Sequence, residues 1–261
     1  MTGRASMHYK IKLLILVLIC LLAFAAMFFV KPIPQDETYH NFADQREILG
    51  IPNFWNVISN IPFFLVGLIG TIAGIKKKWA GLDTPAHGAY LLFFIGVCLS
   101  GLGSSYYHLH PANDTLFWDR LPMAIAFMAF FSAIITEYVH EKLGRVMLLP
   151  LVVLGCCSVI YWRWTEQAGA GDLRFYALVQ FLPMLLIPFI IITHKSRYTR
   201  SKDLYIVLLL YLGAKLAEHF DGFLYTFGRI LSGHSLKHLL AAVGAYWLLR
   251  MLRLRVKIPD S

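Results

Sequence analysis

The sequence predicts an all-α integral membrane protein, with a seven-helix transmembrane core bundle preceded by one extra N-terminal transmembrane helix. Hydrophobic residues make up 58% of the 261 residues and charged residues 15%, against about 45–50% and about 25% in ordinary globular chains. A soluble domain of this size could not bury so much apolar surface. The basic residues, which give a formal net charge of +9, fall in short clusters between long apolar runs, as in a polytopic membrane protein. They form no basic face, so no nucleic acid partner is expected.

Eight apolar stretches approach the roughly 20 residues that a helix needs to cross a bilayer. The first follows Lys10 and Lys12 as a signal peptide would, but its apolar region is too long and no clear small-residue cleavage site follows. We therefore expect it to be a retained leader helix. The eight stretches lie at approximately 11–30, 54–75, 87–108, 117–139, 146–162, 175–193, 204–219 and 233–250.

Lysine and arginine positions predict that both chain ends are cytoplasmic. With the N-terminus inside, sixteen of these residues fall in inner segments, five in outer segments and three within spans, and cytoplasmic loops carry the excess of positive charge. This topology divides the chain into a tail with the leader helix (1–35), the seven-helix domain (36–250) and a basic cytoplasmic tail (251–261). The short loops favour a bacterial inner membrane.

Polar and ionisable residues within the spans mark the candidate functional site, because such groups are costly in a membrane. Ser104 and His108 close the second core helix and share one face at a spacing of i, i+4. Asp119 lies near the start of the third core helix, and His234 and His238 open the seventh, again at i, i+4. In the predicted topology all five lie toward the outer side of the membrane. At about 1.5 Å per residue each lies within roughly 10 Å of a helix end, so three distant segments can meet at one depth.

This combination of residues predicts metal-assisted hydrolysis at the membrane boundary. Three imidazoles with an open fourth position form a catalytic zinc arrangement, and zinc lowers the pKa of bound water to about 7. The glutamate of a His-Glu-x-x-His motif is missing, so Asp119 is the candidate general base, and Ser104 can donate to a developing oxyanion. Haem is the main alternative for paired histidines, but its axial ligands usually come from facing helices.

The same residues resemble the signature of the alkaline ceramidase family, which belongs to a wider group of membrane hydrolases with adiponectin-receptor-like and Per1-like proteins. The Phe-Trp-Asn-Val-Ile-Ser-Asn run at 54–60 also resembles ceramidases, and the resemblance covers about 36–250. It implies that the three histidines hold Zn²⁺, with Ser104 and Asp119 at the reaction centre. It also implies hydrolysis of the ceramide amide to a sphingoid base and a free fatty acid.

The sequence departs from this family in two places. It carries the extra leader helix, and it lacks the Asp-Trp-x-Glu-x-Asn calcium motif that eukaryotic members carry before the first core helix. In those eukaryotic members an acidic residue directly precedes the Phe-Trp-Asn run, whereas Asn53 occupies that position here. The acidic residues of the long outer loop have the chemistry to bind a hard cation, but a solvated acidic loop is the simpler interpretation, and Ca²⁺ regulation is doubtful. These residues are Asp36, Glu37, Asp44 and Glu47.

A second polar cluster, comprising Lys215, Glu218, His219 and Asp221, lies near the outer end of the sixth core helix. In one interpretation Glu218 or Asp221 orients a metal-binding histidine. In the other, Lys215 and Glu218 form an ion pair at i, i+3 that neutralises buried charge. Lys237 is expected to face away from the histidine pair and extend outward.

Other functions use the same residues. A lipid esterase of the Per1-like kind would act on a different bond at the same metal site. A membrane transporter could use Asp119 and the histidines as a relay without hydrolysis, and a receptor could use the scaffold, although the sequence offers no sizeable cytoplasmic domain for signalling. The expected partner is a membrane lipid substrate, ceramide or a related N-acyl lipid, and no protein partner is inferred.

Overall fold

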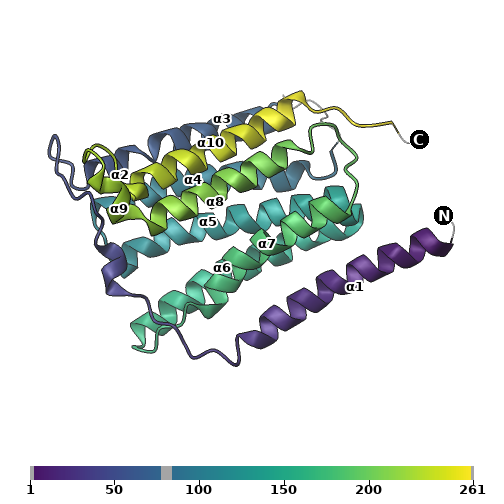
Figure 1. Cartoon of the computed structure of the whole chain (residues 1–261), viewed down its shortest axis with the longest axis horizontal. Coiled ribbons are helices and arrows are strands. Elements are labelled where there is room, and N and C mark those ends of the chain that lie inside the picture. The colour runs from purple at the N-terminus through teal and green to yellow at the C-terminus, as the bar shows by residue number, and fades with distance from the viewer. Residues whose placement is uncertain (1–2, 78–83, 260–261) are drawn as a thin grey trace.

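The computed structural model describes residues 3–77 and 84–259, and this part of the chain contains helices and no strands (Figure 1). Lys78, in the predicted inner basic cluster, lies outside the described residues, as do positions 1–2 and 260–261 of the predicted tails. The helices are α1 (Gly3–Ala26), α2 (Phe54–Ile58), α3 (Ile61–Ile75), α4 (His87–Leu109), α5 (Asn113–Ile134), α6 (Glu141–Gln167), α7 (Arg174–Thr193), α8 (Asp203–His219), α9 (Asp221–Thr226) and α10 (Gly233–Leu254), with a 3-10 turn at Glu37–His40 and a π-helix at Ile135–Val139.

The long helices α3–α8 and α10 run side by side as one bundle (Figure 1). Helix α4 packs between α3 and α5, α5 packs against α6, and α10 packs against both α8 and α3. Helix α1 lies at the edge of the bundle and contacts α7. Both chain ends lie at one end of the bundle, which we call the inner end, and the opposite end is called the outer end.

Six helical segments among the described residues are long and apolar enough to cross a membrane. The predicted all-helical membrane fold is confirmed to this extent. Helices α8 and α10, which correspond to the last two predicted spans, pack in the same bundle but are not among the six, so the count of seven spans plus one stays a prediction. The six are Tyr9–Ala26, Phe54–Ile75, His87–Leu109, Asn113–Val139, Glu141–Gln167 and Arg174–Thr193.

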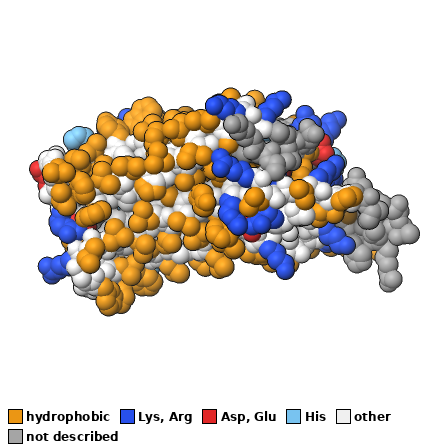
Figure 2. Space-filling model, turned by 90° about the horizontal axis from the view of Figure 1, so that it is seen from above, with side chains coloured by type: hydrophobic (Ala, Val, Ile, Leu, Met, Phe, Trp, Pro, Cys, Tyr) orange, Lys and Arg blue, Asp and Glu red, His pale blue; other side chains and the backbone are white. Residues whose placement is uncertain are grey.

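The surface has the character expected of a protein in lipid. Apolar side chains cover much of the face in Figure 2, and many of the basic side chains lie toward the inner end. Large residues on several helices are well exposed, among them Leu149 at 71%, Ile192 at 69% and Leu209 at 66%. Soluble monomers rarely expose contiguous apolar patches larger than a few hundred Å². The chain is a multi-pass membrane protein.

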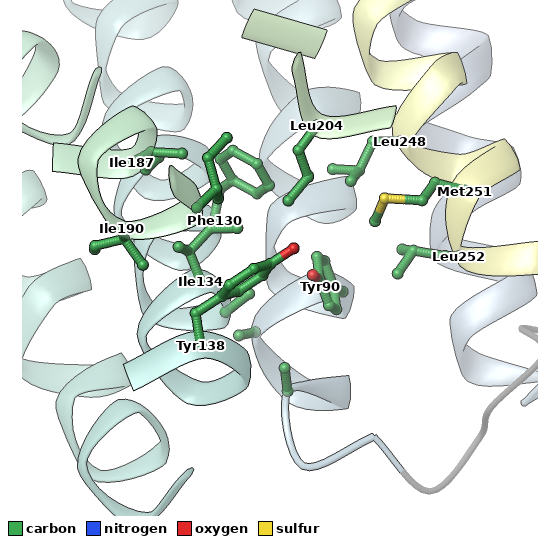
Figure 3. Close-up of a cluster of buried hydrophobic side chains, with 14 of the residues drawn as sticks. Tyr90, Phe130, Ile134, Tyr138, Ile187, Ile190, Leu204, Leu248, Met251 and Leu252 are labelled. Atoms are coloured by element: carbon green, nitrogen blue, oxygen red, sulfur yellow. The ribbon is translucent and has the colours of Figure 1, made fainter. Parts of the chain in front are cut away.

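The inner end is closed by a cluster of buried side chains from several helices, including Tyr90, Phe130 and Leu248 (Figure 3). Near this cluster the Arg255 guanidinium donates to both oxygens of Glu137 at 2.6 and 2.8 Å, and both side chains are 2% exposed. Arg255 belongs to the predicted cytoplasmic tail, but α10 continues to Leu254 and places this side chain inside the protein. The start of that tail is therefore fixed to the bundle.

The first core span is broken between α2 and α3, although the sequence predicts one continuous helix over 54–75. Ser59 and Asn60 lie at the break, where Pro62 occupies the first turn of α3 and cannot supply a backbone N–H. The break places two polar side chains inside the outer end of the bundle, where both are buried.

Candidate metal centre

Three histidines from two distant helices meet at the outer end of the bundle. His108 lies one residue before the end of α4, and His234 and His238 lie in the first two turns of α10. Their exposed fractions are 0%, 4% and 6%. One ring nitrogen from each lies within 4.8 Å of the other two, and the Nε2 atoms of His108 and His234 are 3.3 Å apart. Within the described residues this is the one group of three or more metal-ligating side chains so arranged.

The start of α10 is fixed by hydrogen bonds that set the direction of its two histidines. The Ser232 hydroxyl caps the helix by accepting from the backbone N–H of Ser235 at 3.1 Å. Asp221 accepts from the backbone N–H of His234 at 2.7 Å. Gly233 is required here, because a Cβ at this position would lie 2.1 Å from the carbonyl oxygen of Ala217 on α8.

The ring of His238 is held so that Nε2 is left to bind something else. Its Nδ1 lies 2.8 Å from the Ser59 hydroxyl, and that hydroxyl donates to the Asn56 carbonyl at 3.3 Å. A hydroxyl that donates to a carbonyl accepts from the ring, so Nδ1 carries the proton and Nε2 presents its lone pair. This buried Nε2 has no hydrogen-bond partner among the described residues. A metal ion would satisfy it, so the donor set fits a metal that accepts imidazole ligands, such as zinc, copper, iron or nickel.

Ser104 and Asp119 lie beside the histidines on adjacent helices. Ser104 is one turn before His108 on α4, Asp119 is near the start of α5, and both are buried with their side chains interacting. The helices approach closely because of Gly103, where a Cβ would lie 2.0 Å from the Trp118 carbonyl oxygen. A hydroxyl and a carboxylate are therefore held together next to the three imidazoles.

A cavity of about 380 Å³ extends from these residues into the bundle. Ser104, Asp119 and His238 line its outer end, and Phe130, Val207 and Leu248 line its inner part. Along α10 its wall runs from Lys237 to Leu248, which at about 1.5 Å per residue is roughly 16 Å. The cavity is therefore elongated, polar where the histidines lie and apolar beyond them.

The outer loop 31–53 covers the histidines. The Phe42 ring is 5% exposed, and its centroid lies 4.7 Å from the ring centroids of both His108 and His234. The backbone N–H of Ala43 donates to Asp221 at 2.9 Å, and the Asn53 amide donates to the His108 carbonyl at 2.9 Å. The loop thus shields the site from water on this side.

The interpretation of this loop as solvated holds for Asp36, Glu37 and Glu47, which are exposed, but is wrong for Asp44. Asp44 is 1% exposed, and Arg46 donates to both of its oxygens at 2.8 and 2.6 Å. Burial raises the pKa of Asp44, but the hydrogen bonds from Arg46 outweigh it and hold the pKa below its usual value. Within the described residues no three of the loop's acidic side chains converge as metal ligands would.

A family model described as Ceramidase matches residues 49–258. The chain belongs to the ceramidase family. The comparison with curated proteins found no match. The matched region contains α2 to α10 and all five candidate site residues, whereas α1 and most of the covering loop lie outside it. Since ceramidases hydrolyse an amide-linked lipid, family membership makes hydrolysis the expected class of reaction.

In this ceramidase-family chain the second polar cluster forms an ion-pair network. Glu218 accepts from Lys215 at 2.8 Å and from Lys237 at 2.5 Å, which matches the ion-pair interpretation. The prediction that Lys237 extends outward is wrong, because its side chain is 18% exposed and lines the cavity. Neither Glu218 nor Asp221 bonds a histidine ring within the described residues; Asp221 binds the backbone of His234 instead. His219 is exposed.

Several residues that build the site were not identified from the sequence. Ser59 contacts His238, and Asn56 accepts at 2.8 Å from the Ser235 hydroxyl on α10. Both belong to the Phe-Trp-Asn-Val-Ile-Ser-Asn run. The three polar residues of this run lie within a predicted membrane span, where polar groups are costly, and this could have marked them as part of the site. Phe42 and Tyr39, from the covering loop, carried no such signal.

Proposed function

We propose that this chain is a zinc-dependent intramembrane amidase that hydrolyses ceramide or a related N-acyl lipid to a sphingoid base or other amine and a free fatty acid. The observation that carries the proposal is the group of three buried histidines, with Ser104 and Asp119 beside it, at the head of an elongated apolar cavity. His108, His234 and His238 would hold the metal. A zinc ion held there would polarise a carbonyl and lower the pKa of water to about 7, so that the water gives up a proton more easily.

The remaining chemistry belongs to residues of this chain. Asp119 accepts a proton from the attacking water and returns it to the amine, which otherwise leaves poorly. Ser104 donates a hydrogen bond to the carbonyl oxygen as negative charge develops there. The Phe42 ring covers the histidines and keeps bulk water away from them. Electrostatic interactions at the site are stronger for this reason, because the dielectric constant there is lower than in water.

The shape of the cavity supports an acyl lipid as the substrate. Its volume of about 380 Å³ lies within the roughly 300–1,000 Å³ of ligand sites. With the amide at the polar end, the acyl chain extends along α10 past Ala241, Gly244 and Ala245 toward the inner end. Small residues on this face leave room for the chain.

The proposed topology has eight spans, with residues 36–250 as the catalytic domain. Both chain ends are cytoplasmic, and the metal centre lies toward the non-cytoplasmic face. Basic residues near the inner end support this orientation, including Lys195, Arg250 and Lys257. A ceramide in the outer leaflet would then present its amide near the depth of the histidines.

Fatty acid release tests the proposal. Purified protein is incubated with a panel of N-acyl and O-acyl lipids, and the products are measured by mass spectrometry. We expect release from ceramide, reduced by about 10²–10⁴-fold in Asp119→Asn, the usual range for loss of general acid–base catalysis. Asp114→Asn is the matched control, because Asp114 lies on the same helix and its side chain is 73% exposed. Release from O-acyl lipids alone would indicate a Per1-like esterase, and no release from metal-loaded protein would favour a transporter or receptor.

A further inference from the structure

The outer end of the cavity carries more charge than a neutral lipid requires. Five charged side chains line it, three of them cationic and two anionic: Asp119, Arg120, Lys215, Glu218 and Lys237. Charged groups are expensive within a membrane protein unless they are paired. The cavity therefore has one protein cation in excess of its carboxylates.

Glu218 cannot supply the missing negative charge. One of its oxygens accepts from Lys215 and the other from Lys237, and the Tyr39 hydroxyl donates to it at 3.2 Å. This one carboxylate thus serves two ammonium groups. Asp119 interacts electrostatically with Lys237 and Arg120, but as the proposed general base it must be able to take up a proton.

Arg120 is the one cation of this group that forms no salt bridge with a carboxylate among the described residues. It is 7% exposed, and its guanidinium carbon lies 4.3 Å from the ring centroid of Trp162 and 5.0 Å from that of Tyr176. One terminal nitrogen donates to Gln35 at 2.7 Å. The other, Nη1, is buried and has no hydrogen-bond partner among the described residues, and no carboxylate of the described chain forms a salt bridge with Arg120. The aromatic rings stabilise the charge of the guanidinium group. The buried N–H groups of Nη1 still lack a hydrogen-bond acceptor, which costs free energy unless a ligand supplies one.

These cations lie next to the reacting groups. Arg120 and Lys237 line the same cavity as Asp119 and His238, and both cations interact electrostatically with Asp119. An acceptor that contacts them is therefore close to the scissile amide. Guanidinium and ammonium groups together are well suited to a carboxylate.

We propose that the preferred substrate is an N-acyl amino acid, whose carboxylate is bound by Arg120 and Lys237. This inference rests on the proposed amidase function. In such a lipid the carboxylate is one carbon from the amide nitrogen, so a carboxylate that contacts these cations leaves the amide in the part of the cavity that Asp119 lines. Water adds to the acyl carbon and the C–N bond breaks, with the proton passing to the amine. The products are a fatty acid and a free amino acid.

The test compares N-palmitoylglycine with N-palmitoylethanolamine. The two lipids share the acyl chain and the amide, but the first carries a carboxylate where the second carries a hydroxymethyl group. We expect kcat/KM at least about tenfold higher for N-palmitoylglycine, the scale of one charge-assisted hydrogen bond. Arg120→Met should bring this ratio close to unity, because it removes the cation whose N–H groups lack an acceptor, whereas Lys142→Met, which replaces an exposed lysine at the inner end, should leave the ratio unchanged. Equal kcat/KM values for the two amides, or ceramide cleaved better than N-palmitoylglycine, would overturn the inference while the amidase function stands.

A binding measurement tests the carboxylate site separately from the proposed amidase function. The dissociation constants of both amides are measured in Asp119→Asn protein, with and without Arg120→Met. We expect N-palmitoylglycine to bind about tenfold more tightly than the ethanolamide, and this preference to disappear in the double variant. Equal binding of the two amides would refute the carboxylate site. If no amide is hydrolysed by the wild-type protein, the proposed function fails, and the binding preference alone then decides whether the carboxylate site exists.

Discussion

Replacing Ser59 with alanine removes the hydroxyl that lies 2.8 Å from Nδ1 of His238. This hydroxyl links the ring to the Asn56 carbonyl, and so fixes both the tautomer and the orientation that leave Nε2 available for a metal. Loss of such a supporting hydrogen bond typically costs 10–100-fold in metal affinity, which corresponds to about 1.4–2.7 kcal/mol.

The structure favours the lower half of this range. The His238 ring stays packed against His108 and His234 without the hydroxyl, with centroid separations of 5.0 and 5.1 Å. We therefore expect Ser59→Ala to weaken zinc binding by about tenfold.

Zinc affinity is measured by competition with a chromophoric chelator in detergent. Ser105→Ala is the matched control, because the Ser105 hydroxyl donates to the carbonyls of Gly101 and Val57 and forms no hydrogen bond with a histidine in the described part of the chain. The control should bind zinc as the wild type does. The reasoning is refuted if Ser59→Ala keeps wild-type affinity, or if Ser105→Ala loses as much.

Two further predictions concern stability. Glu137→Gln leaves the buried Arg255 without its carboxylate and should destabilise the protein by about 3–5 kcal/mol, seen as a large fall in the thermal unfolding midpoint. An unchanged midpoint would contradict it. Because Arg46 lowers the pKa of Asp44, Asp44 stabilises the fold above its unfolded pKa of about 3.9, and this stabilisation is lost as the pH falls through the lower native value. The midpoint of wild type should exceed that of Asp44→Asn at pH 7, and the difference should shrink at pH 3; a constant difference would count against this.

The helices were predictable because apolar runs and basic clusters are local features of the chain. The predicted span 175–193 corresponds to α7 (Arg174–Thr193), and the predicted span 204–219 to α8 (Asp203–His219). The break at Ser59 and Asn60 was not predicted, because the run 54–75 is predominantly apolar despite its few polar residues, and a single proline near a helix start is compatible with a helix.

The contacts that complete the site depend on tertiary packing that no local pattern records. Ser59 and His238 are 179 residues apart, and Lys237 turns toward Glu218 because α10 packs against α8. From the sequence alone, a lysine beside the histidine face looks as if it points to lipid headgroups. Asp44 likewise looks solvated until Arg46 and the buried Asn56, which donates to the Asp44 carbonyl at 3.0 Å, are seen around it.

The metal content of the purified protein tests the central claim most directly. The chain is purified without added chelator, exposed to zinc, dialysed and analysed by inductively coupled plasma mass spectrometry. We predict about one zinc ion per wild-type chain, as in three-histidine catalytic sites, and loss of that zinc in His234→Ala/His238→Ala protein that keeps its helical content. A folded wild-type protein that holds no stoichiometric metal, or a double variant that binds zinc as well as wild type does, would contradict the account.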